Sequence, residues 1–308
     1  MTHELYKKYR PKKLKDIIGQ DDTVSVLKTY IEKKTIPHAI LFAGPSGCGK
    51  TTLARILKKK VGCAGQDFSE INASDFRGID TIRDIRKHAP LGAIGGGSRC
   101  WLVDECHLLT KDAQNSFLKL LEDTPEHVYF FLATTEPKKL LATIRTRCTD
   151  FNLKLLAEPD IQKLIKKVCK AEKVKLSDDV VEKLIDHSDG SARKCLVLLE
   201  KVAGLKKEEE QLDAIESEQD DKEAIEVFSA LINPQTNWKK MVGVLRGVQA
   251  EPESIRWLVL GCCNNIMLNA GRGKQWGRAN TIIEAFMDPF YDSKKAGLIS
   301  ACYEVITG

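Results

Sequence analysis

The side chains best suited to chemistry lie in a short glycine-rich segment. The pattern G-x-x-x-x-G-K-[ST] is matched at every fixed position by Gly44-Pro45-Ser46-Gly47-Cys48-Gly49-Lys50-Thr51. Backbone N–H groups of such a loop surround phosphate oxygens, and the helix that follows points its positive end at the same place. The Lys50 ammonium can reach the β- and γ-phosphates of a nucleotide, and the Thr51 hydroxyl can bind Mg²⁺. The loop and the following Thr52 are therefore predicted to bind a nucleotide.

An acidic pair supplies the second half of this chemistry. Asp104 and Glu105 end an apolar run that starts at Cys100. Such a run suits a buried strand of a parallel sheet, whose carboxyl end is where α/β proteins place ligands. Asp104 is predicted to hold Mg²⁺ through water, and Glu105 to polarise an attacking water. An acidic pair after a strand is usually a solvated strand end, but its position downstream of a phosphate loop favours a catalytic role.

The elements that must hold these residues alternate between strand-like and helical patterns. Strands are predicted over Ala39–Ala43, Phe68–Asn72, Cys100–Asp104, Val128–Thr134 and Cys148–Leu153. Helical patterns lie between them, around residues 21–34, 51–61, 78–88 and 110–122. This alternation predicts an α/β domain over residues 1–154, with a parallel sheet covered by helices on both faces.

Beyond this domain the strand signals stop, and only helical patterns follow. Three short helices are predicted over Asp160–Lys170, Asp178–His187 and Ser191–Val202, with Ser177 capping the second, so residues 155–205 form a small helical domain. The acidic stretch from Lys206 to Glu226 is interpreted partly as a boundary and partly as a solvated helix face. Residues 206–308 are predicted to form a third domain that is all helical.

One helix of this third domain carries a continuous apolar stripe. The residues of the stripe are Ile255, Leu258, Val259, Cys262, Cys263, Ile266, Met267 and Ala270. Packing in the core of a helical bundle is favoured for this stripe, and a dedicated subunit interface is the alternative.

The composition limits the class of protein. The 308 residues are 43% hydrophobic, which is ordinary for a globular chain, and the net charge of +5 is too small to argue nucleic-acid binding by itself. No signal peptide and no apolar run long enough to span a membrane is visible. The ten cysteines lack the spacing of a disulfide framework or a zinc site, so they are predicted to be reduced thiols of a cytoplasmic protein.

Several further segments form a recognisable set. They are Tyr9-Arg10-Pro11, Ile17 to Gln20, Asn72 to Asp80, Thr124 to Val128 and Leu132 to Pro137. With the phosphate loop and the acidic pair, this set resembles the AAA+ ATPase subunits of sliding-clamp loaders. The third segment is similar to the small subunits of replication factor C, and the last two are similar to bacterial DNA polymerase III gamma/tau. The resemblance covers residues 4–205 and implies an AAA+ nucleotide-binding domain (1–154), a helical lid (155–205) and an all-helical collar for oligomerisation (206–308).

The resemblance implies roles for residues outside the two motifs. Thr135 takes the sensor-1 position, which orients the attacking water or touches the γ-phosphate. Arg193 takes the sensor-2 position of the lid and should lie over the γ-phosphate. Arg147 takes the place of the arginine finger that acts on ATP bound by a neighbouring subunit, and Arg145 is a nearby competitor. The segment implied to lie on the nucleotide side is Tyr9, Arg10 and Pro11.

The resemblance also implies a grip on duplex DNA, and two helices are the expected contacts. Arg83, Arg86 and Lys87 fall at i, i+3 and i+4 after Gly78, so they share one helix face that can track phosphates without reading bases. A second helix starts at Thr110 to Gln114, and its N-terminus can point at a phosphate, so Gln114 is included among the predicted DNA contacts. A solvated basic face is the alternative interpretation.

The resemblance implies an ATPase that binds ATP and Mg²⁺ and loads a sliding clamp onto primer–template DNA. The expected partners are the clamp, that DNA, and other loader subunits in a homo- or hetero-oligomeric pentameric ring. Two alternatives stay open: an AAA+ ATPase of recombination and branch migration, and a non-hydrolysing structural subunit of a loader. The four-cysteine zinc module usual in gamma/tau subunits is missing, since only Cys63 stands in that region. A compact subunit of this kind is compatible with a phage-encoded protein or a minimal replication system, and bacterial and phage sources both stay open. The expected location is the cytoplasm of a bacterial or phage-infected cell.

Overall fold

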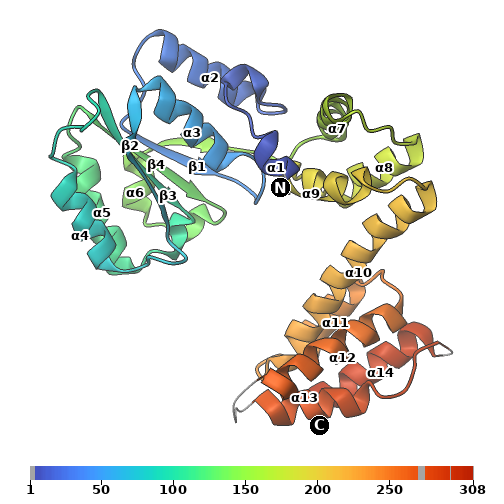
Figure 1. Cartoon of the computed structure of the whole chain (residues 1–308). Helices are drawn as coiled ribbons and strands as arrows, with labels where there is room; N and C mark the ends of the chain where they lie inside the picture. Colours follow the sequence, from blue (N-terminus) through green and yellow to red (C-terminus); the bar gives the residue numbers. More distant parts are fainter. Residues whose placement is uncertain (1–3, 270–274, 292, 308) are drawn as a thin grey trace. The chain divides into compact units, whose positions relative to one another are not determined.

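The chain divides into two compact units, residues 1–204 and 205–308. The computed structural model describes residues 4–269, 275–291 and 293–307, and Figure 1 shows the path of the chain through both units. In the described part of the chain, no helix is both long and apolar enough to cross a membrane.

The first unit is built on a five-stranded parallel sheet. The strands are β1 (Ala39–Ala43), β2 (Cys63–Asn72), β3 (Ser98–Asp104), β4 (Val128–Thr134) and β5 (Thr149–Asn152). Their order across the sheet is β2-β3-β4-β1-β5, and every neighbouring pair is parallel. The predicted α/β class and all five predicted strands are therefore confirmed, although β2 begins five residues earlier than expected, at Cys63 rather than Phe68.

The helices of the sheet domain cover both faces, as predicted. They are α1 (Leu5–Lys8), α2 (Asp21–Glu32), α3 (Lys50–Lys60), α4 (Ile79–His88), α5 (Lys111–Glu122) and α6 (Ala142–Arg147), with short 3₁₀ turns at η1 (Leu14–Asp16), η2 (Cys106–Leu108) and η3 (Pro137–Lys139). Alternate residues of β1 pack into different cores because successive strand side chains point to opposite faces. Leu41 joins α4, α5 and α6 in one core, and Phe42 joins α2 and α3 in the other.

Three helices complete the first unit. They are α7 (Glu158–Glu172), α8 (Asp178–His187) and α9 (Ala192–Ala203), close to the predicted bounds. The Ser177 hydroxyl accepts a hydrogen bond from the Val180 N–H, which confirms the predicted cap of α8. The Gln20 side chain binds the chain where it leaves the sheet, since its amide donates to the Lys154 carbonyl at 2.7 Å and its oxygen accepts from the Lys154 N–H at 3.3 Å.

The regular secondary structure of the second unit is all helical among its described residues. Its helices are α10 (Glu208–Ile232), α11 (Trp238–Gly247), α12 (Pro252–Asn269), α13 (Gln275–Ala285) and α14 (Lys294–Thr307). The acidic stretch is helical from Glu208 onward, so only the residues before it form the predicted boundary.

The predicted apolar stripe lies on α12. Ile255, Val259 and Cys263 are fully buried in the core of this unit, so core packing is confirmed for them. Leu258, Ile266 and Met267 pack against the same core, whereas Cys262 is half-buried. Ala270, the last residue of the predicted stripe, lies outside the described residues.

Candidate nucleotide-binding and catalytic site

The glycine-rich loop connects β1 to α3. At two of its positions a side chain would collide with a neighbouring segment, and the neighbour differs between the two. Gly44 has a φ of +149°, and a Cβ there would collide with the Leu153 carbonyl oxygen. Gly47 has a φ of +77°, and a Cβ there would collide with the Ser191 hydroxyl at the start of α9. The second glycine therefore allows the helical lid to approach the loop closely.

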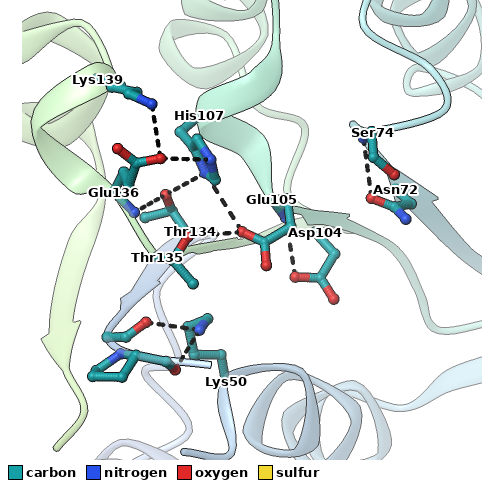
Figure 2. Close-up of polar contacts among 12 residues, drawn as sticks. Lys50, Asn72, Ser74, Asp104, Glu105, His107, Thr134, Thr135, Glu136 and Lys139 are labelled. Carbon is teal, nitrogen blue, oxygen red and sulfur yellow. Dashed lines mark hydrogen bonds and ion pairs between the residues drawn. The ribbon is translucent and has the colours of Figure 1, made fainter. Parts of the chain in front are cut away.

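Lys50 is the first residue of α3 and its side chain turns back over the loop. Its Nζ donates to the carbonyl oxygens of Gly44 and Pro45, both at 2.7 Å, and the residue is buried (Figure 2). Gly49 has no side chain to cap α3, so the first N–H groups of that helix are left for an anion. The ammonium and the helix end together form a cationic site suited to phosphate.

One loop residue stays uncharged in this setting. Burial raises the pKa of the Cys48 thiol, although the nearby Lys50 charge works in the opposite direction. Cys48 therefore remains a neutral thiol at neutral pH and leaves the positive charge of the loop to Lys50.

The two predicted magnesium ligands lie side by side. The Thr51 hydroxyl donates to Asp104 Oδ2 at 2.9 Å, and the other oxygen of Asp104 accepts from the Glu105 N–H at 3.0 Å. Hydroxyl and carboxylate oxygens suit Mg²⁺, which is usually bound by one or two protein ligands together with phosphates and water. These residues therefore fit a magnesium ion held jointly with a nucleotide.

Glu105 leaves the end of β3 in a left-handed backbone conformation. Its φ is +48° and its ψ is +41°, an arrangement that costs roughly 1 kcal/mol or more for a residue with a Cβ. Its Oε2 accepts a hydrogen bond from the Thr135 hydroxyl at 3.2 Å. The predicted general base and the predicted sensor-1 residue are therefore in direct contact.

A single pocket brings the loop, the acidic pair, the N-terminal segment and the lid helices together. Its lining includes Tyr6, Tyr9, Arg10, Pro11, Ile17, Ile18, Ser46 to Thr52, Asp104, Glu105, Leu164, Lys167, Val168, Arg193 and Leu196. The polar end carries the phosphate loop, and the apolar residues of the N-terminal segment and lid suit a flat base. The N-terminal segment is fixed to the lid because the Tyr9 hydroxyl donates to Glu172, which also pairs with Lys8 at 2.6 Å.

Two predicted arginines lie in different places. Arg193 lines the pocket, and its guanidinium lies 5.9 Å from the centre of the Tyr6 ring. Arg147 ends α6 outside the set of residues that line the pocket, where it is paired with Glu122 and donates to the Thr143 carbonyl at 3.1 Å. Its side chain is partly exposed, so it is accessible to a second molecule.

The predicted DNA-contacting residues of α4 are exposed, but acidic residues lie among them. Arg83 pairs with Asp80 at 2.9 Å, and Lys87 lies 3.5 Å from Asp84. Arg86 is exposed on the same helix. Since exposed pairs of this kind are weak, they do not prevent the cations from meeting phosphates.

The structure contradicts the prediction for Gln114. Its side chain is 3% exposed, its amide donates to the Leu109 carbonyl at 3.0 Å, and its oxygen accepts from the Leu141 N–H at 2.9 Å. The residue belongs to the inward face of α5, beside Ala113 and Phe117. Its polar groups are therefore used inside the protein, where they join the start of α5 to the residue before α6, and are not presented to DNA.

Sequence reasoning also missed two residues of the site. Tyr6 lines the pocket near Arg193, and nothing in its sequence position marks it. His107 lies in the turn after the acidic pair, with its ring close to Glu105. The signal for His107 was a polar residue within the otherwise apolar run Cys106-His107-Leu108-Leu109.

Comparison with known proteins shows the family of this chain. The family described as DNA polymerase III, delta subunit, matches residues 19–75 and 66–157, and the family described as RCF1/5-like, AAA+ ATPase lid domain, matches residues 163–203. A replication factor C small subunit of Archaeoglobus fulgidus is 31% identical over 302 residues, which are 97% of this chain and 89% of that protein. The chain belongs to the clamp-loader family of AAA+ ATPases.

One further sequence relative and one solved structure show how much of this clamp-loader chain resembles other known proteins. The DNA polymerase III subunit gamma/tau of Mycobacterium bovis is 34% identical over 221 residues, and the match covers 64% of this chain but only 38% of the relative's length. The solved structure of the Thermotoga maritima RuvB Holliday junction branch migration motor matches with a TM-score of 0.59 and 21% identity, over 81% of this chain and 84% of that one. The likeness to RuvB shows the shared AAA+ fold alone.

Replacing Lys50 tests the phosphate site. Lys50→Ala should weaken the binding of a fluorescent ATP analogue by about 10- to 100-fold, because a charged hydrogen-bond donor to phosphate contributes about 1.5–3 kcal/mol. Lys60→Ala, at the exposed end of the same helix, is the matched control and should bind as the original protein does. Equal affinity of both variants would show that the loop is not the phosphate site.

Proposed function

We propose that this chain is an ATP-hydrolysing subunit of a clamp loader, which uses ATP to open a ring-shaped sliding clamp and place it on primer–template DNA. The observation that carries the proposal is the shared pocket of the phosphate loop, the Thr51–Asp104 pair, Glu105 and Arg193. A subunit with only a structural role would have no need for this set of side chains in one place.

The chemistry proposed for this pocket is hydrolysis of the γ-phosphate. Lys50 binds the β- and γ-phosphate oxygens, and Arg193 of the lid neutralises charge on the γ-phosphate. Thr51 and Asp104 would hold Mg²⁺, which would supply positive charge against the negative charge of the nucleotide phosphates. Water attacks the γ-phosphorus, its proton passes to the Glu105 carboxylate, and ADP leaves with the electrons of the broken P–O bond.

The roles of Thr135 and Arg147 complete the proposal. The Thr135 hydroxyl holds the Glu105 carboxylate by the 3.2 Å hydrogen bond and orients the attacking water. Arg147, outside the pocket of its own chain, acts on ATP bound by the neighbouring subunit, where a planar guanidinium suits the charge that grows on the transferring group.

We assign a separate function to each of the three predicted domains. Residues 1–154 bind and hydrolyse ATP, residues 155–205 form the lid, and residues 206–308 form the collar that joins subunits into a pentameric ring. The exposed cations Arg83, Arg86 and Lys87 contact the DNA backbone. The names of the relatives support replication as the setting. The proposed location is the cytoplasm of a bacterial or phage-infected cell.

Branch migration remains the second candidate, since the fold is shared with RuvB. The relatives favour clamp loading because a replication factor C small subunit matches over nearly the whole chain at higher identity than RuvB does. ATPase rates separate the two functions. Hydrolysis should rise strongly with primed DNA, and again when a sliding clamp of the same replication system is added. Stimulation by a four-way DNA junction, with no response to primed DNA and clamp, would favour branch migration instead.

Replacing the proposed general base tests the hydrolysis step. Glu105→Gln should keep nucleotide affinity but lower kcat by about 10²- to 10⁴-fold, because the amide cannot accept the proton of water. Glu126→Gln, an exposed carboxylate after α5, is the control and should leave kcat unchanged. Wild-type turnover in Glu105→Gln would remove Glu105 from the mechanism.

The arginine finger is tested by mixing subunits. Arg147→Ala should leave the ATP affinity of an isolated chain unchanged but reduce hydrolysis in the assembled ring by roughly 10³- to 10⁵-fold. Arg145→Ala, two residues earlier, serves as the control and should retain turnover. Chains with Lys50→Ala should restore part of the activity of Arg147→Ala chains. The Lys50→Ala chain supplies an intact Arg147, and the Arg147→Ala chain supplies an intact phosphate loop that binds ATP. If no mixture recovers activity although both variants assemble, Arg147 does not act on a neighbour.

A further inference from the structure

His107 is a buried titratable residue at the site that the proposed hydrolysis does not use. It belongs to the η2 turn, two residues after Glu105, and its side chain is 6% exposed. Its Nδ1 lies 3.0 Å from Thr134 Oγ1 and 3.5 Å from Glu105 Oε2, and its Nε2 lies 3.4 Å from Glu136 Oε1 (Figure 2). The ring therefore stands between the Glu105 carboxylate, just after β3, and the loop that follows β4.

The contacts around the ring fix its orientation. Thr134 Oγ1 accepts the Glu136 N–H at 3.0 Å, so its hydroxyl proton is left for one further acceptor. Nδ1 lies against that hydroxyl and faces Glu105 Oε2, and Nε2 faces Glu136. A proton on Nδ1 is what makes the contact with the Glu105 carboxylate attractive, so the positioning role described below requires an Nδ1–H. The end of β4 holds the ring in place.

Glu136 is anionic in this arrangement. Its carboxylate pairs with Lys139 at 2.8 Å, and this hydrogen bond, together with the charge of Lys139, lowers the pKa of Glu136. A series of side-chain contacts thus runs from the exposed Lys139 on η3 through Glu136 and His107 to Glu105. Glu105 is 34% exposed and its Oε2 contacts two groups at the end of this series, the Thr135 hydroxyl and the His107 ring.

We propose that His107 is a positioning residue that fixes the direction of the Glu105 carboxylate and couples it to the Glu136 loop. This inference rests on the proposed function, because it assigns His107 a task only if Glu105 is the base. A general base must lie within about 2.6–3.2 Å of the proton that it removes, and a misplacement of about 1 Å can cost roughly 10²-fold in rate. A single hydroxyl leaves the flexible glutamate side chain free to rotate about that bond, whereas a second contact from a buried ring restricts it.

Substitutions of His107 separate positioning from packing. His107→Ala should lower kcat by about 10- to 100-fold while KM for ATP and the affinity for a fluorescent ATP analogue stay within about twofold. His107→Asn places an amide near the position of Nδ1 and should recover part of the loss, whereas His107→Gln places its amide near Nε2 and should recover less. Cys106→Ala, the buried neighbour in the same turn, is the matched control for packing and should keep turnover.

A double-mutant cycle provides a readout that a packing defect would not change. In a Glu105→Gln background, His107→Ala should cost little further activity, because the carboxylate that it positions is gone. Glu136→Gln alone should lower kcat in the same direction as His107→Ala, but by less. Independently of hydrolysis, the ring resonance of His107 in a ¹H–¹³C spectrum should move in both Glu105→Gln and Glu136→Gln.

The outcomes distinguish this inference from the function on which it rests. If the original protein hydrolyses ATP and Glu105→Gln abolishes turnover while His107→Ala keeps it, the positioning role is wrong and the proposed function stands. The positioning role is equally wrong if the losses from His107→Ala and Glu105→Gln simply add. If the original protein shows no hydrolysis with primed DNA and clamp, the proposed function fails and this inference fails with it.

Discussion

The pairing of β4 between β1 and β3 determines where every functional group of the site lies. In register, Ala43 of β1 stands opposite Thr134 of β4, and Leu132 of β4 stands opposite Val103 of β3. Because the strands are parallel, the phosphate loop, the acidic pair and Thr135 all emerge at one edge of the sheet. A shift of β4 by one residue would exchange its two buried faces and move Thr135 away from Glu105.

The parts that the sequence predicts well are those governed by local pattern. The apolar strands, the helices between them and the cap at Ser177 depend on periodicity and on side chains next to each other in the chain, and the structure confirms them. The motif spacing also brought Thr51 and Asp104 together correctly, since both follow strands that end at the same edge. Their role as ligands for Mg²⁺ remains a prediction.

The parts that the sequence could not supply depend on contacts between distant segments. Gln114 looked available in the first turn of a helix, but which face of α5 turns inward is decided by packing, and its partners at Leu109 and Leu141 lie outside the turn itself. The earlier start of β2 follows from pairing with β3, since Cys63 is opposite Ser98 with an irregularity before Phe68. The closeness of His107 to Glu136 likewise required the fold, because 29 positions separate the two residues in the chain.

The composition of the pocket has a thermodynamic consequence. Its lining runs from Tyr6 in the N-terminal segment to Leu196 in α9, which spans nearly all of the first unit. A nucleotide that binds this lining has no equivalent site in the unfolded chain, so its binding free energy adds to the free energy of unfolding of the whole unit. At a ligand concentration of about 100 times Kd the gain is about 2.7 kcal/mol. Nucleotide occupancy and the conformational stability of this unit are therefore linked quantities, and the cellular ATP concentration contributes to the stability of the folded chain.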